Sequence, residues 1–124
     1  MEAAYPVRYT QWALREGSGE HRGGLGAVYE IELLEQEAEA FVFADRARFA
    51  PKGVLGGGDG ACNLVTYEQA DGWQTPPLGS KVVGVQLRRG QRVRIESPGG
   101  GGWGDPARRG AERIQRDRRM GYCA

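Results

Sequence analysis

The sequence is poor in the residues that build metal and redox centres. Among its 124 residues are 2 cysteines, Cys62 and Cys123, which lie far apart without a CxxC neighbour, and a single histidine, His21. A structural zinc site needs four Cys or His ligands, usually in closely spaced pairs. We therefore expect no metal and no other cofactor in this chain itself, and two free thiols rather than a disulfide.

An excess of one charge and a long hydrophobic run are also lacking. The 17 basic residues nearly cancel the 16 acidic ones, and a net charge of +1 gives no general attraction to nucleic acid or to an anionic membrane. No stretch reaches the roughly 18 apolar residues of a membrane span, and the first residues do not resemble a signal peptide. We expect a cytoplasmic protein with no nucleic-acid partner and no membrane partner.

Large aliphatic side chains are scarce, whereas glycine is abundant. Leu, Ile, Val and Phe together make up just under a fifth of the chain, against 21 Gly and 6 Pro. Such a chain loses much backbone entropy on folding and has few large side chains to offset that loss. Balanced charge, 3 Trp and 5 Tyr nevertheless argue against disorder. We expect a folded but core-poor domain that packs loosely alone and needs buried surface from a partner.

Short runs of alternating polarity indicate strands over most of the chain. The predicted strands are 5–15, 27–34, 39–45, 62–67, 81–87 and 92–96, with a turn region at 71–80. The connection at 35–37 predicts a hairpin between the second and third strands, and the four-residue loop 88–91 predicts another between the last two.

The C-terminal segment has a different character. From Asp105 onward, six arginines stand against three acidic residues, and a helix is predicted over 111–120 with Gly121 as its stop. The thin apolar stripe of this helix favours a surface position. A solvated face with salt-bridged pairs is the simpler interpretation of the arginines, and a local basic face is the alternative.

These elements predict a mainly β fold with a small antiparallel sheet or barrel-like domain, glycine-rich extended loops and one C-terminal helix. We expect a single domain over 1–124. It comprises a β-rich part at 1–97, a glycine-rich segment at 98–106, and the helix and tail at 107–124.

The glycine-rich segment matches a nucleotide-binding pattern only superficially. Gly99, Gly101 and Gly104 fit G-x-G-x-x-G between a strand and a helix, but no second parallel strand and no acidic ribose ligand can follow. Backbone without side-chain bulk can instead pack closely against another backbone. We therefore predict an assembly or structural role, and no cofactor role, for Arg22, Gly23, Gly24, Gly26, Gly57, Gly58, Gly99, Gly100, Gly101, Gly102, Trp103, Gly104 and Asp105.

Motif segments recur in a fixed order along nearly the whole chain. They are 2–8, 17–19, 22–26, 45–53, 56–60, 80–81, 98–106 and 121–122, and the most specific of them contains PGGGGWGDP. In this order they resemble the C-terminal part of the hydantoinase B family, which includes subunits of 5-oxoprolinase, acetone carboxylase and acetophenone carboxylase. Family members usually have several hundred residues, and a chain with its own Met1 begins here where their last segment would begin. The resemblance therefore implies a separate small subunit, most similar to that of acetophenone carboxylase.

The resemblance also implies an activity and partners. The complex would carboxylate an aromatic ketone with ATP and bicarbonate, and ATP with Mg would bind to larger subunits. The expected partners are larger hydantoinase A-like and hydantoinase B-like subunits. No catalytic residue maps onto this chain, where the only histidine stands apart from any serine or cysteine motif. The alternatives are the C-terminal subunit of an ATP-dependent hydantoinase or 5-oxoprolinase-type amide hydrolase, and an independent binding module.

Overall fold

The computed structural model describes residues 4–15 and 19–123 and shows a mainly β, antiparallel fold with one C-terminal α-helix, which confirms the predicted fold class. The elements of the described residues are β1 (Val7–Arg15), β2 (Gly26–Leu33), β3 (Glu37–Phe43), β4 (Leu64–Gln69), β5 (Gly72–Gln74), β6 (Lys81–Arg88), β7 (Arg92–Glu96), the short 3-10 helix η1 (Pro106–Arg108) and α1 (Ala111–Arg119). Strand β5 lies where the sequence predicted only a turn region, and it pairs with β4.

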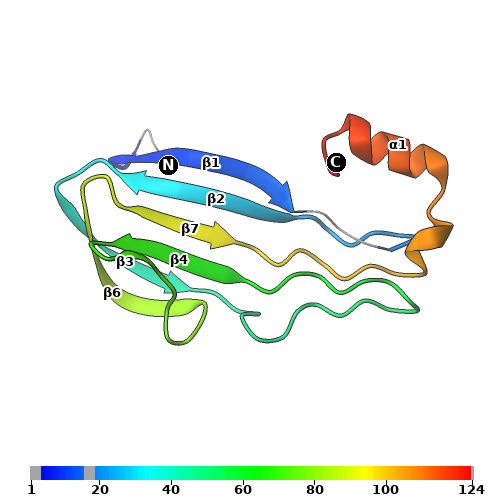
Figure 1. Cartoon of the computed structure of the whole chain (residues 1–124), viewed down its shortest axis with the longest axis horizontal. Helices are drawn as coiled ribbons and strands as arrows, with labels where there is room; N and C mark the ends of the chain where they lie inside the picture. The colour runs from blue at the N-terminus through cyan, green and yellow to red at the C-terminus, as the bar shows by residue number, and fades with distance from the viewer. Residues whose placement is uncertain (1–3, 16–18, 124) are drawn as a thin grey trace.

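Both predicted hairpins are wrong. Strand β3 pairs with β6 in a two-stranded sheet, whereas β2 and β7 belong to a five-stranded sheet with the order β1-β2-β7-β4-β5 (Figure 1). Each short connection carries the chain from one sheet to the other, and the two connections are hydrogen-bonded together, with Arg89 N donating to Gln36 O at 3.0 Å. A hairpin alone would leave its apolar face in water, and two packed sheets cover that face.

The core lies between the two sheets and is small. Leu33 of β2 packs with Val85 and Leu87 of β6, and partly buried neighbours surround them, namely Val7, Ala38, Ala40, Tyr67, Val82 and Val93. Among the described residues, only five large hydrophobic side chains are buried, namely Val28, Leu33, Val65, Val85 and Leu87, and of these only Val65 is fully buried. Burial on this scale stabilises a domain only modestly, at roughly 1.5–3 kcal/mol per large side chain.

The rest of the chain extends away from the sheets. Segments 19–25, 51–61 and 97–104 run side by side toward η1 and α1, which lie at the end of the molecule opposite the turns that join the sheets (Figure 1). The Asp105 side chain caps η1 by accepting from Ala107 N at 2.9 Å. Helix α1 begins where the sequence predicted and ends at Arg119, one residue early, with Gly121 in the left-handed region at φ 70°. In the part of the chain that the structure describes, no helix has the length and apolarity to cross a bilayer.

Candidate functional site

The predicted site residues gather in three extended segments that we call the glycine layer, residues 19–26, 51–61 and 97–104. The third segment is hydrogen-bonded to the first through Trp103 N and His21 O at 2.8 Å. It is also bonded to the second through Gly102 N and Gly58 O at 2.8 Å. The layer is therefore held by main-chain hydrogen bonds, although almost none of it is regular strand.

Glycine is required in this layer because backbones lie closer than a side chain allows. A Cβ atom at Gly101 would lie 2.1 Å from Lys52 O, one at Gly57 would lie 2.2 Å from Gly102 O, and one at Gly23 would lie 2.3 Å from Gly100 O. Gly24 differs, because a Cβ atom there would meet nothing within 4 Å. The close partners all belong to this chain, so the glycine run first of all builds its own fold.

Three of the predicted residues are not glycines. Arg22 and Trp103 belong to the layer, and Asp105 follows it directly. Trp103 is about half exposed, and its ring lies 5.3 Å from that of His21. The Asp105 side chain accepts the hydrogen bond that caps η1. Arg22 points instead toward helix α1. The structure thus brings the predicted residues together, while their role in assembly stays a prediction.

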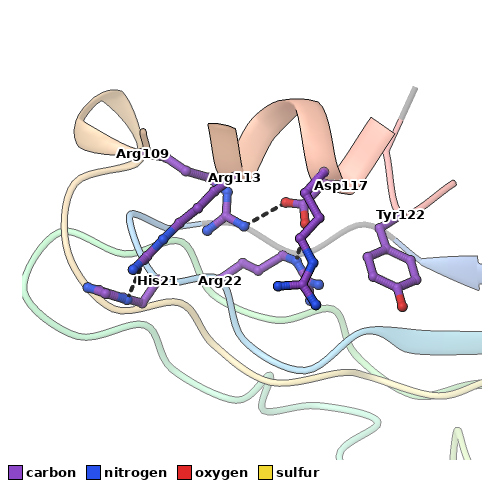
Figure 2. A pocket seen from close by; sticks show the side chains of 7 residues that line it. His21, Arg22, Arg109, Arg113, Asp117 and Tyr122 are labelled. Carbon is purple, nitrogen blue, oxygen red and sulfur yellow. Dashed lines mark hydrogen bonds and ion pairs between the residues drawn. The ribbon is translucent and has the colours of Figure 1, made fainter. Parts of the chain in front are cut away.

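A depression of about 530 Å³, which we call the arginine pocket, lies between the glycine layer and α1. Figure 2 shows its side chains converging from the first segment of the layer and from the C-terminal part of the chain. Its lining consists of His21, Arg22, Arg109, Arg113, Arg116, Asp117 and Tyr122. Among the described residues, four guanidinium groups and one carboxylate therefore line the pocket.

Asp117 organises one side of the arginine pocket. Its Oδ2 accepts from Arg109 Nη2 at 2.7 Å, and its Oδ1 accepts from Arg22 Nε at 3.2 Å. Desolvation alone would raise the pKa of the Asp117 carboxyl, but the hydrogen bonds from Arg109 and Arg22 outweigh it, so this pKa is lowered. Asp117 is therefore a buried anion that fixes two guanidinium groups.

The opposite side of the arginine pocket is held by His21. Arg113 Nη1 lies 2.8 Å from His21 Nδ1. Because a guanidinium can only donate, Nδ1 is the acceptor in this contact. Arg22 also stacks over Tyr122, with its guanidinium carbon 4.9 Å from the ring centre.

A second polar cluster covers the outer face of the five-stranded sheet. Arg92 of β7 donates to Glu68 of β4 at 2.7 Å and to Glu30 of β2 at 2.9 Å, while Thr10 of β1 donates to Glu30 at 2.7 Å. Each charge in this triad has an opposite partner. The cluster therefore ties strands β1, β2, β4 and β7 together.

Large apolar side chains lie exposed on the outer side of the β3–β6 sheet and the loops beside it. This surface, which we call the apolar face, consists of Phe41, Phe43, Phe49, Leu78 and Val83, each more than half exposed. Part of it forms a hollow of about 580 Å³ that includes Phe49, Leu78 and Lys81. A hydrophobic surface of this kind is typical of a contact with another protein.

Nucleophilic groups are not brought together in the described residues. Ser80 is buried and donates to Ala44 O at 2.9 Å, and Ser97 accepts from Ala27 N at 2.8 Å. Ser18 lies outside the described residues. Cys62 and Cys123 are free thiols, and within the described part of the chain no group of three His, Cys, Asp or Glu residues could hold a metal.

Sequence reasoning missed most of the arginine pocket. It did not single out Arg109, Arg113, Arg116, Asp117 and Tyr122, because each alone is typical of a solvated helix. The signal that could have revealed the pocket was the excess of arginine after Asp105. From the sequence alone, this excess indicates a solvated, salt-bridged face first and a local basic face only as an alternative. Which arginines converge depends on how α1 docks against the glycine layer.

Comparison with known proteins places the chain in a family. The profile of the hydantoinase B/oxoprolinase family matches residues 1–106. The chain is 29% identical over 125 residues to the B component of a putative D-/L-hydantoinase from Pseudomonas sp. (strain NS671), covering 98% of this chain and 21% of that protein. It is 35% identical over 110 residues to 5-oxoprolinase 1 from Arabidopsis thaliana, covering 84% of this chain and 8% of that protein.

A solved structure also resembles the whole chain. The crystal structure of the ATP-dependent caprolactamase from Pseudomonas jessenii has a TM-score of 0.71 and 27% sequence identity, and the match covers 100% of this chain and 22% of that one. The chain therefore spans about a fifth or less of the length of these relatives.

Proposed function

The chain belongs to the hydantoinase B/oxoprolinase family, and from this premise we propose that it is one segment of an ATP-dependent enzyme that opens cyclic amides. Hydantoin, 5-oxoproline and caprolactam, after which its relatives are named, are all rings that contain an amide bond. This shared chemistry favours amide hydrolysis over ketone carboxylation. The acetophenone carboxylase-type activity stays a prediction that none of these relatives' names supports.

One observation carries this proposal. The complete fold of the chain corresponds to 22% of a much larger chain, and its own apolar face is exposed. A protein with only five buried large hydrophobic side chains in its described part gains much by burying such a face against a neighbour. The expected neighbour is the remainder of a hydantoinase B-like subunit, with a hydantoinase A-like subunit completing the complex.

The chain contributes architecture rather than chemistry in this proposal. The glycine layer holds α1 and Trp103 at a fixed distance from the two sheets, and Trp103 is exposed enough to anchor in a neighbouring pocket. ATP and Mg²⁺ are assigned to the larger partners. The reacting groups are assigned there too, because no nucleophile and base meet within the described residues.

The proposal is tested by isolating the complex. The tagged full chain is expressed in its own organism, co-purifying chains are identified by mass, and ATP hydrolysis is measured with hydantoin, 5-oxoproline and caprolactam, and separately with acetophenone and bicarbonate. Co-purification of longer subunits with amide-dependent ATP hydrolysis is expected. Stimulation only by acetophenone with bicarbonate would establish the carboxylase instead, and a chain that purifies alone as a stable monomer would overturn the assembly role.

A further inference from the structure

The arginine pocket carries more positive charge than its internal ion pairs use. Four arginines line it, and Asp117 is the only acidic group that the described residues contribute to the lining. The formal charge of the lining is therefore strongly positive, in a chain whose total net charge is only +1. Side chains of like charge repel each other, so such a cluster is stable only when something compensates it.

Several donors in the pocket have no partner among the described residues. Arg116 makes no side-chain hydrogen bond or ion pair there, and Arg113 bonds only to the His21 ring, which carries no negative charge. Arg109 Nε is buried without any hydrogen-bond partner, although both terminal nitrogens of that guanidinium are engaged. A buried, unpartnered donor is unfavourable and is rare in native proteins unless a ligand or water completes it.

Three of the four arginines, Arg22, Arg109 and Arg113, are held in position before any ligand arrives. The side chains of Arg22 and Arg109 are 24% and 15% exposed, and the two oxygens of Asp117 fix them. Figure 2 shows Arg113 crossing toward His21 on the other side of the depression. Guanidinium groups fixed in this way bind a multiply charged oxyanion without first having to be ordered.

We infer that the arginine pocket is a binding site for a doubly charged oxyanion of the phosphate class. The anion accepts from Arg113 and Arg116, and the Arg22–Asp117–Arg109 cluster forms the back of the site. Most of this lining comes from residues beyond 106, where the family match ends. The inference does not depend on the proposed amide hydrolysis, because binding is measured on this chain itself.

The test compares phosphate with chloride at matched ionic strength, on the full-length chain, by calorimetry and by thermal shift. Arg116→Gln removes one free guanidinium without breaking any ion pair, and a tenfold loss of affinity is expected, roughly the loss of one charge-assisted hydrogen bond. Arg118→Gln is the matched control, because it removes the same charge from the same helix outside the pocket. Circular dichroism verifies that both variants keep the fold.

Each outcome decides the inference. Saturable phosphate binding that Arg116→Gln weakens and Arg118→Gln leaves intact supports it. Equal losses in the two variants would mean general attraction to a positive surface and would overturn the site. Malonate, a dicarboxylate, serves as the comparison ligand. Tighter binding of malonate than of phosphate would overturn the phosphate class and point to carboxylates of a partner chain, and an absence of binding beyond that of chloride would leave only a structural cluster.

Discussion

At Gly101, one atom decides whether the glycine layer forms. The sequence predicts close backbone approach at this position, with a positive φ as a further source of strain if it occurs there. Gly101 is not among the residues with positive φ, and the reason lies wholly in the 2.1 Å between its would-be Cβ and Lys52 O. A carbonyl oxygen of the backbone cannot swing aside as a side chain can, so the neighbouring segment must shift.

We predict that Gly101→Ala destabilises the chain by about 3 kcal/mol, the upper range for overpacked positions. Gly24→Ala is the control within the same layer, because its Cβ meets nothing within 4 Å, and its stability should stay within about 1 kcal/mol of the parent. Urea unfolding followed by tryptophan fluorescence measures both variants. Equal effects would show that backbone contact is not the reason for the glycine at 101.

The charge state of the Glu68 carboxyl group makes the free energy of unfolding depend on pH. A side-chain hydrogen bond from Arg92 lowers the pKa of Glu68 below its ordinary value of 4.5. A carboxyl with a lowered folded pKa contributes stability that is fully present above the unfolded pKa and is lost as pH falls through the folded pKa.

Glu68→Gln should therefore cost about 1 kcal/mol at pH 7, and the difference from the parent should shrink steadily below about pH 4.5. The measurement is urea unfolding from pH 7 to pH 3. Glu37→Gln serves as the control, because Glu37 is exposed and has no ion-pair or side-chain hydrogen-bond partner among the described residues. A Glu68→Gln penalty that stays constant down to pH 3 would contradict the assigned role of the carboxylate.

At the scale of elements, charge holds together strands that hydrophobic contacts alone bind weakly. The outer face of the five-stranded sheet joins β2, β7 and β4 through the Glu30–Arg92–Glu68 triad. Glu30 is only 7% exposed, and its charge is compensated chiefly by Arg92 at 2.9 Å, with Arg94 more distant at 3.9 Å. The sheet thus relies on a polar network where larger proteins use a second apolar layer.

Arg92→Gln should lower the free energy of unfolding by about 2 kcal/mol, because it leaves Glu30 buried and poorly compensated. Arg8→Gln breaks the Arg8–Glu32 pair on the same sheet, where the Arg8 side chain is 61% exposed, and should cost no more than about 0.5 kcal/mol. Thermal unfolding of both variants at low and high salt provides the comparison. Similar losses would mean that burial of Glu30 does not set the strength of the network.

The whole molecule is unusually open for its size. Its two sheets enclose one small core, while the apolar face points outward and the glycine layer extends away from the sheets (Figure 1). Such a chain is marginally stable alone, and burial against a partner raises its apparent stability by mass action.

Replacing Phe41 and Phe43 together by Ser should leave the isolated fold intact, because both side chains are already exposed, and should abolish retention of the larger subunits. Met120→Ser is the control, since Met120 is exposed at the far end beside α1. Retention is measured by co-purification, and folding by circular dichroism of the isolated variants. A double variant that still retains the larger subunits would remove the apolar face from the interface.

Local chemistry was enough to place most elements. Alternation located β1, β2, β6 and β7 to within a residue or two, and Asp105-Pro106 with Gly110 and Gly121 located η1 and α1. Which strands pair with each other could not be predicted from local sequence, because most paired strands lie far apart in the chain. A turn at 34–36 fits a hairpin as well as it fits a crossing between sheets, because both begin with the same reversal of direction.

What the sequence by itself determined is the set of short-range features: strands with polar and apolar faces, a capped helix, and a glycine run too poor in side chains to be anything but closely packed backbone. Tertiary structure alone decided that β3 pairs with β6 instead of β2, that the backbone at Gly101 lies against Lys52, and that arginines spread over 22–116 line one pocket. The physical reason is that burial and charge compensation are properties of neighbours in space. Those neighbours are chosen by the whole chain when it covers its few apolar side chains.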